Sequence, residues 1–216
     1  MKKAIHLLSF LAKAGGSDMI LDIVIIAGEL AATVFSIEKH GWWKQFRYYT
    51  QCSNYILLFV TLVHLCLLLM KKKMPEAVDR CRYYATCLTT VTFVVTVCIL
   101  IPWYGHPSFF LIETNGLFYH LLCPLFAIAQ LPFITCIRKK DTRLAMIPTV
   151  VYGIVLYTLN FLKVVDGPYP FLKVYEQPWY MSILWFLILA ALAFGIAVVL
   201  WKICGRKQRK QGGGIR

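Results

Sequence analysis

The feature that most constrains this chain is a series of six apolar stretches, each close to the roughly 20 residues that a helix needs to cross a bilayer. They take up most of the 216 residues, so no room remains for a separate soluble domain. Charged residues make up only 15% of the chain, whereas about a quarter of an ordinary soluble domain is charged. The sequence therefore predicts an all-α, polytopic membrane protein with six transmembrane helices. The stretches lie at about residues 19–37, 46–70, 83–104, 116–137, 144–163 and 179–201.

The positive charges are distributed unevenly between the two ends of these predicted spans. With six spans, the two termini and the 71–82 and 138–143 loops share one side, and they hold 18 of the 23 Lys and Arg residues. Cytoplasmic segments of membrane proteins carry such an excess. We therefore expect both termini in the cytoplasm and the protein in the cell membrane. The net charge of +13 fits this topology and attraction to anionic lipid, so we expect no nucleic-acid partner.

The segments outside the spans are short. Residues 1–18 predict an amphipathic helix at the membrane interface, residues 19–203 the six-helix domain, and residues 204–216 a basic, disordered tail. The eight cysteines are scattered without a CxxC pair, so neither a disulfide framework nor a metal site is expected. We predict no cofactor.

The second span opens with the sequence "RYYTQCSN", which is unusually polar for a membrane helix. Thr50, Ser53 and Asn54 are three or four residues apart and therefore share one face of the helix. Hydrocarbon offers no hydrogen-bond partners, and each unpaired polar group there costs several kcal/mol. We expect this stripe to face an interior cavity that opens toward the outer leaflet.

The fourth span enters from the same side with "YHLLCP". At a rise of about 1.5 Å per residue, His120 and Thr50 lie within one helical turn of each other in depth. Pro124 has no N–H to bond the carbonyl of residue 120, so we expect the helix to kink and open there. A histidine whose tautomer is fixed by a hydrogen bond is suited to be a general base.

The fifth span and the loop after it predict further parts of the same site. Tyr157 and Asn160 share a face in the outer half of that span. The loop that follows contains two prolines, and we expect it to be an ordered lid over the cavity. The lid residues singled out are Gly167, Tyr169, Pro170 and Phe171.

The first span carries two carboxylates, Asp22 and Glu29, at a spacing of seven residues. A charge at mid-bilayer costs at least about 2.5–3.5 kcal/mol, so each carboxylate should be paired or protonated. Asp22 lies at the depth of His64, and we interpret that pair as structural. Glu29 lies one or two turns below Thr50 and could orient His120.

In "YYTQCSN", "YHLLCP" and "GPYPFL", the chain resembles the androgen-induced membrane hydrolases over about residues 15–203. It is more closely similar to their bacterial relatives, a proline-marked family of six-span membrane proteins. The resemblance implies hydrolysis of fatty acid esters of hydroxy fatty acids, with Thr50 and His120 as the catalytic pair. Related six-span acyltransferases use cysteine, which keeps Cys52 as an alternative nucleophile.

The leading hypothesis is an intramembrane hydrolase that acts on a lipid or fatty-acyl ester with Thr50 as nucleophile and His120 as base. Oxyanion stabilisation is expected from Ser53, Asn54 or Asn160. Two alternatives are a cysteine-based acyltransferase and a proton-coupled membrane carrier whose relay would be built from the intramembrane acids and histidines. A third alternative is a binding or scaffold protein that catalyses no reaction.

Overall fold

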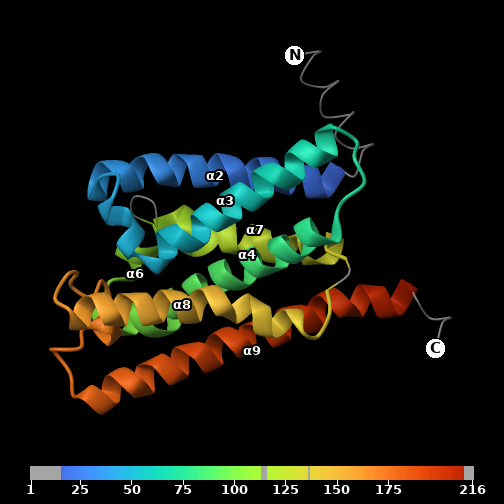
Figure 1. Ribbon diagram of the computed structural model, residues 1–216. Helices are drawn as coiled ribbons and strands as arrows, with labels where there is room; N and C mark the ends of the chain where they lie inside the picture. Colours follow the sequence, from blue (N-terminus) through green and yellow to red (C-terminus); the bar gives the residue numbers. More distant parts are fainter. Residues whose placement is uncertain (1–15, 113–115, 136, 212–216) are drawn as a thin grey trace.

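The computed structural model describes residues 16–112, 116–135 and 137–211, the last seven of these by their backbone alone. Within these ranges every regular element is a helix. The long helices lie side by side along one common direction and form an elongated bundle (Figure 1). The prediction of an all-α chain is confirmed for this part of the protein.

The helices differ in length and winding. The α-helices are α2 (Gly16–His40), α3 (Tyr49–Leu69), α4 (Glu76–Val95), α5 (Ile101–Tyr104), α6 (Pro107–Leu111), α7 (Cys123–Ala129), α8 (Asp141–Phe161) and α9 (Trp179–Gln211). The 3₁₀-helices are η1 (Lys44–Arg47), η4 (Leu131–Phe133) and η5 (Pro170–Leu172), and the π-helices are η2 (Thr96–Leu100) and η3 (Leu117–Leu122).

Five helical stretches are long and apolar enough to cross a membrane. They are Gly16–His40, Tyr49–Leu69, Glu76–Tyr104, Asp141–Phe161 and Trp179–Cys204. Large apolar side chains such as Ile154 on α8 and Leu187 on α9 are exposed on the outside of the bundle, as contact with lipid requires. These features indicate a multi-pass membrane protein.

The fourth predicted span is shorter than expected and changes its winding twice. Apolar helix covers Leu117–Phe133 rather than 116–137, beginning as the π-helix η3, continuing as α7 and ending as the 3₁₀-helix η4. Pro124 lacks the N–H that an α-helix would bond to the carbonyl of His120. The wider π winding lies directly before this proline, at the place where the sequence predicts a disturbed helix.

Helix α4 occupies the centre of the bundle and packs against α3, α7, α8 and α9. In Figure 1, α2 and α3 lie on one side of α4, and α8 and α9 lie on the other. Its buried threonines donate to carbonyls of the preceding turn, as Thr86 does to Arg82 and Thr90 does to Thr86. Small side chains that satisfy their own hydroxyls allow neighbouring helices to approach closely inside a membrane.

Helix α2 begins and α9 ends at the same end of the bundle (right in Figure 1). The opposite end holds the start of α3 and is called the Thr50 end below. Helix α9 continues as far as Gln211, into the segment predicted as a disordered tail over 204–216. Of the predicted interfacial helix over 1–18, residues 1–15 lie outside the described part of the chain, and 16–18 belong to α2.

Candidate active site at the Thr50 end

The polar stripe at the start of α3 faces the inside of the bundle. Thr50, Ser53 and Asn54 are all buried, and their exposed fractions are 7%, 1% and 0%, respectively. Ser53 Oγ donates to the Thr50 carbonyl at 3.0 Å and lies 2.9 Å from the hydroxyl of Thr92 on α4. Asn54 Nδ2 donates to the same carbonyl at 2.7 Å and to the Tyr119 carbonyl at 3.3 Å. These contacts hold the first turn of α3 against α4 and η3.

This arrangement corrects one expectation. Ser53 and Asn54 were predicted as oxyanion donors, but their donor groups are already bonded to the Thr50 carbonyl and to neighbouring helices. They position Thr50 instead. The i, i+3 and i, i+4 spacing that places them on the face of Thr50 also brings their side chains back onto its carbonyl.

The Thr50 hydroxyl lies beside the imidazole of His120. The distance from Thr50 Oγ1 to His120 Nε2 is 3.4 Å, and the other ring nitrogen, Nδ1, lies 2.7 Å from the Phe110 carbonyl. A carbonyl oxygen only accepts, so Nδ1 must carry the proton. Nε2 then has a free lone pair directed at the Thr50 hydroxyl. This is the tautomer that a general base for Thr50 requires.

The Phe110 carbonyl reaches His120 because α6 lies very close to the start of η3. A Cβ on Gly116 would lie only 2.4 Å from the Phe110 carbonyl oxygen, so glycine is required at this position. The role given to Glu29, to orient His120, is therefore taken by a backbone carbonyl. Glu29 is fully buried beside Cys123, and its carboxylate oxygens accept no hydrogen bond from the described residues.

Tyr169 of the loop between α8 and α9 brings a second hydroxyl to Thr50. Its oxygen lies 3.4 Å from the Thr50 backbone nitrogen and 3.5 Å from Thr50 Oγ1. The Thr50 N–H belongs to the first turn of α3, which has no intrahelical acceptor, so it donates to the phenol oxygen. The phenol proton remains available for Thr50 or a bound molecule. Burial raises the pKa of Tyr169 to about 12, so this hydroxyl stays protonated at neutral pH.

The two polar residues near the end of α8 hold this loop. The Tyr157 hydroxyl donates to the Phe171 carbonyl at 2.7 Å. Asn160 Nδ2 donates to the Val165 carbonyl at 3.0 Å, and Asn160 Oδ1 accepts from the Val174 N–H at 2.8 Å. The oxyanion role expected for Asn160 is not supported, because both halves of its amide are bonded to loop backbone.

Close packing also shapes the loop. A Cβ on Gly167 would lie 2.7 Å from the Leu172 backbone, so the chain can double back only with glycine there. Pro170 begins the 3₁₀-helix η5, and the rings of Tyr169 and Phe171 stack with centroids 5.3 Å apart. The loop is therefore ordered by its own contacts and carries Tyr169 onto the head of α3.

Two cavities meet at Thr50. The wider one has a volume of about 680 Å³, and its polar wall includes Lys39, Gln51 and His120. The narrower one, of about 60 Å³, runs between α4, α8 and α9 and has an almost entirely apolar wall. Thr50 and Tyr169 line both. Thr50 thus lies between a cavity with several polar groups in its wall and a cavity whose wall is almost entirely apolar.

Cys52, the alternative nucleophile, and Cys123, three residues after His120, have other neighbours. Cys52 Sγ lies 3.4 Å from the Phe46 carbonyl, to which its thiol donates. Cys123 is buried and approaches the Ile25 carbonyl on α2 at 4.0 Å. Among the described residues, the Cys123 thiol has the Glu29 carboxylate beside it, and neither thiol is paired with His120.

Three features of this site were not predicted from the sequence. The Phe110 carbonyl has no sequence signal because any residue supplies one. Tyr169 was expected as part of a lid, and its position between two prolines gave no indication that its hydroxyl reaches Thr50. Lys39 lies over the Phe109 ring at 4.6 Å and lines the wider cavity. The sequence did not indicate this position, because a lysine at the end of a span is equally expected at a membrane interface.

The chain matches no protein-family model, no curated protein and no solved structure.

Proposed function

We propose that this protein is an intramembrane hydrolase of lipid esters, with Thr50 as nucleophile and His120 as general base. The single observation that carries the proposal is the 3.4 Å approach of Thr50 Oγ1 to a His120 Nε2 whose partner nitrogen is fixed by the Phe110 carbonyl. That distance is somewhat longer than the roughly 2.6–3.2 Å of an engaged pair, as is common without substrate. The resemblance to the androgen-induced membrane hydrolases concerns the same two residues.

In the first half of the reaction, Thr50 Oγ attacks the ester carbonyl carbon while its proton passes to His120 Nε2. The tetrahedral intermediate carries a negative oxygen, for which the Tyr169 O–H is the available donor. The intermediate collapses when the bond to the alcohol oxygen breaks. His120 returns the proton to that oxygen, and the alcohol leaves with the acyl group on Thr50.

In the second half, a water molecule attacks the acyl carbon and gives its proton to His120. The Thr50–acyl bond then breaks, the proton returns to Thr50 Oγ, and the free fatty acid is released. The apolar wall between α4, α8 and α9 matches an acyl chain in polarity, and its cavity of about 60 Å³ takes a short part of such a chain; the wider cavity has room for the alcohol part and the water. Fatty-acyl esters, including those of hydroxy fatty acids, are the substrate class that we propose.

The proposed topology follows from the charge distribution and the helices together. Leu117–Phe133 would be a sixth, shorter crossing in addition to the five long ones, with both termini in the cytoplasm of a cell-membrane protein. The Thr50 end would then face outward, and substrate would enter from the outer leaflet. Cysteine accessibility labelling in intact cells tests this directly: Ser108→Cys should react with an impermeant maleimide, and Lys72→Cys should not.

The proposed chemistry is tested by labelling purified protein with a fluorophosphonate probe and identifying the modified residue by mass spectrometry. We expect the adduct on Thr50 and loss of labelling in Thr50→Ala and His120→Ala. Thr90→Ala is a matched control, because Thr90 is a buried threonine whose hydroxyl serves only its own helix. Labelling that persists in Thr50→Ala, or an adduct on Cys52, would refute the assignment.

A further inference from the structure

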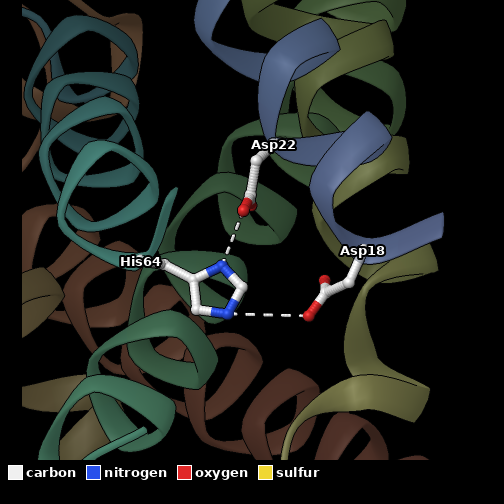
Figure 2. A group of neighbouring side chains, drawn as sticks. All are labelled: Asp18, Asp22 and His64. Atoms are coloured by element: carbon white, nitrogen blue, oxygen red, sulfur yellow. Dashed lines mark hydrogen bonds and ion pairs between the residues drawn. The ribbon is translucent and has the colours of Figure 1, made fainter. Parts of the chain in front are cut away.

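A second polar cluster lies near the end of the bundle opposite Thr50. It joins Asp18 and Asp22 of α2 to His64 of α3, with one carboxylate at each ring nitrogen (Figure 2). Nδ1 of His64 lies 2.7 Å from Asp22 Oδ2, and Nε2 lies 3.6 Å from Asp18 Oδ2. The three side chains are exposed by only 14%, 0% and 2% for Asp18, Asp22 and His64. The reaction proposed for Thr50 makes no use of them.

The hydrogen bonds of Asp22 determine the tautomer of His64. Gln130 Nε2 donates to Asp22 Oδ1 at 2.7 Å, which holds the carboxylate with Oδ2 toward the imidazole. An ionised carboxylate only accepts, so Nδ1 of His64 carries the shared proton. In the neutral ring, Nε2 then has a free lone pair that faces Asp18 Oδ2. Both atoms are then acceptors, and either a proton on Nε2 or a bound cation is needed to join them.

The 3.6 Å gap between these two atoms suits a metal ion. It is longer than a good hydrogen bond. Two metal bonds of about 2.1 Å, the usual length for nitrogen and carboxylate ligands of zinc, span this gap at an angle of roughly 118°, which a distorted tetrahedral site accommodates. One ligand atom from each of Asp18, Asp22 and His64 lies within 4.8 Å of the others, so the three side chains form one compact group.

The surrounding charges favour a divalent cation. Asp18 Oδ1 accepts from Arg82 Nη2 at 2.5 Å, and Arg82 Nη1 lies 3.7 Å from Asp79 Oδ1. The three carboxylates of Asp18, Asp22 and Asp79 therefore stand against one guanidinium, and the four groups sum to −2 when ionised. Protonation of His64 would leave −1, whereas a divalent ion brings the sum to zero. Unbalanced charge is expensive in a buried, poorly solvated place.

We propose that Asp18 and His64, supported by Asp22, bind one divalent transition-metal ion, for which zinc is the best fit. Imidazole nitrogen with carboxylate oxygen is a donor set typical of zinc. Asp22 acts as the carboxylate that fixes the ligand tautomer, an arrangement that recurs around metal-binding histidines, and Arg82 fixes Asp18 in the same way. The bound ion ties α2 to α3 at the end of the bundle far from Thr50.

The experiment uses full-length protein in detergent, stripped with EDTA and passed over a desalting column. CoCl₂ is titrated while visible absorption is recorded, because tetrahedral Co²⁺ reports the geometry of its site, and ZnCl₂ is then added to displace it. We expect one ion per chain, a visible cobalt band that zinc abolishes, and a higher Tm with zinc than after EDTA. The absence of saturable binding to the wild-type protein would overturn the proposal.

Variants separate this site from adventitious binding. His64→Gln should lose the saturable binding, and the isosteric Asp22→Asn, which keeps the shape of the site, should bind about 10–100-fold more weakly. His106→Gln removes an exposed histidine at the Thr50 end and is the matched control, with unchanged binding expected. Binding that is unchanged in both His64→Gln and Asp22→Asn would mean an adventitious ion only and would refute the assignment. Size-exclusion profiles and tryptophan fluorescence verify that each variant is folded.

Discussion

Replacement of Tyr169 by phenylalanine removes one hydroxyl from the candidate site and little else. The ring stacks on Phe171 and packs edge-on against Tyr48, and phenylalanine preserves both contacts. The lid itself is held by Tyr157 and Asn160, which the substitution does not touch. The change therefore isolates the contribution of a hydrogen-bond donor beside Thr50.

The expected size of the effect differs between the resting protein and the reaction. At rest the Tyr169 hydroxyl makes two long contacts, of 3.4 and 3.5 Å, so its loss should cost less than about 1.5 kcal/mol of stability. In the transition state, removal of one oxyanion donor typically lowers kcat by about 10²–10³-fold, or about 2.7–4 kcal/mol. We expect a kcat loss of that order with KM and Tm nearly unchanged.

The assay is steady-state hydrolysis of a fluorogenic oleoyl ester in mixed micelles, with Tm measured on the same preparation. Tyr175→Phe is the matched control, because its hydroxyl donates to the Phe161 carbonyl at 2.6 Å and belongs to the same loop, away from Thr50. Equal losses in both variants would show that the loop, rather than the Tyr169 hydroxyl, controls the rate. A Tyr169→Phe enzyme with full kcat would refute the oxyanion role.

The pH dependence gives an independent check on the same hydroxyl. Burial raises the pKa of Tyr169 from the usual 10 to about 12, so folding favours its neutral form. Its contribution to stability is present below pH 10 and is lost as the pH rises through 12. Up to about pH 10, ionisation of Tyr169 should therefore not lower kcat. The pH profiles of the wild type and of Tyr169→Phe should have the same shape over this range.

Two further substitutions test the cavity and the buried acid. Ala190 lies in the wall of the narrow cavity, and Ala190→Phe should shift the preference toward shorter acyl chains in a kcat/KM series from C4 to C18. Ala191→Phe, on the exposed side of α9, is the control and should leave the preference unchanged. A chain-length preference that neither variant changes would place the acyl chain elsewhere. Glu29→Gln should keep probe labelling and change the free energy of unfolding by less than about 1 kcal/mol, because no described residue donates to its carboxylate. A hundredfold loss of labelling in the folded variant would restore Glu29 as a partner of His120.

The sequence was informative wherever one helix could be considered by itself. Apolar length predicted the membrane class and helical spacing predicted the buried stripe at Thr50. The depth argument also selected His120, because depth depends on rise per residue and not on how helices are rotated. The structure places these two side chains together.

The rest depends on rotation and on loop packing, which no single helix encodes. Glu29 lies at a suitable depth, but α2 is turned so that its carboxylate meets Cys123. The Phe110 carbonyl and the Tyr169 hydroxyl arrive from loops, whose course is decided by contacts such as the close approach at Gly116. The pairing of Asp22 with His64 was predicted from depth, whereas the approach of Asp18 was not.

The π winding of η3 makes the position of His120 depend on a single inserted residue. A π-helix holds one residue more than an α-helix that spans the same two ends, and such insertions recur at functional sites. Removal of one residue from Leu117–Leu122 would let an α-helix span the same two ends, and the side chains inside this segment would change direction. His120 would then leave both Thr50 and the Phe110 carbonyl without any change to its own side chain. A related chain could thus keep the histidine and the threonine and still lack the pair.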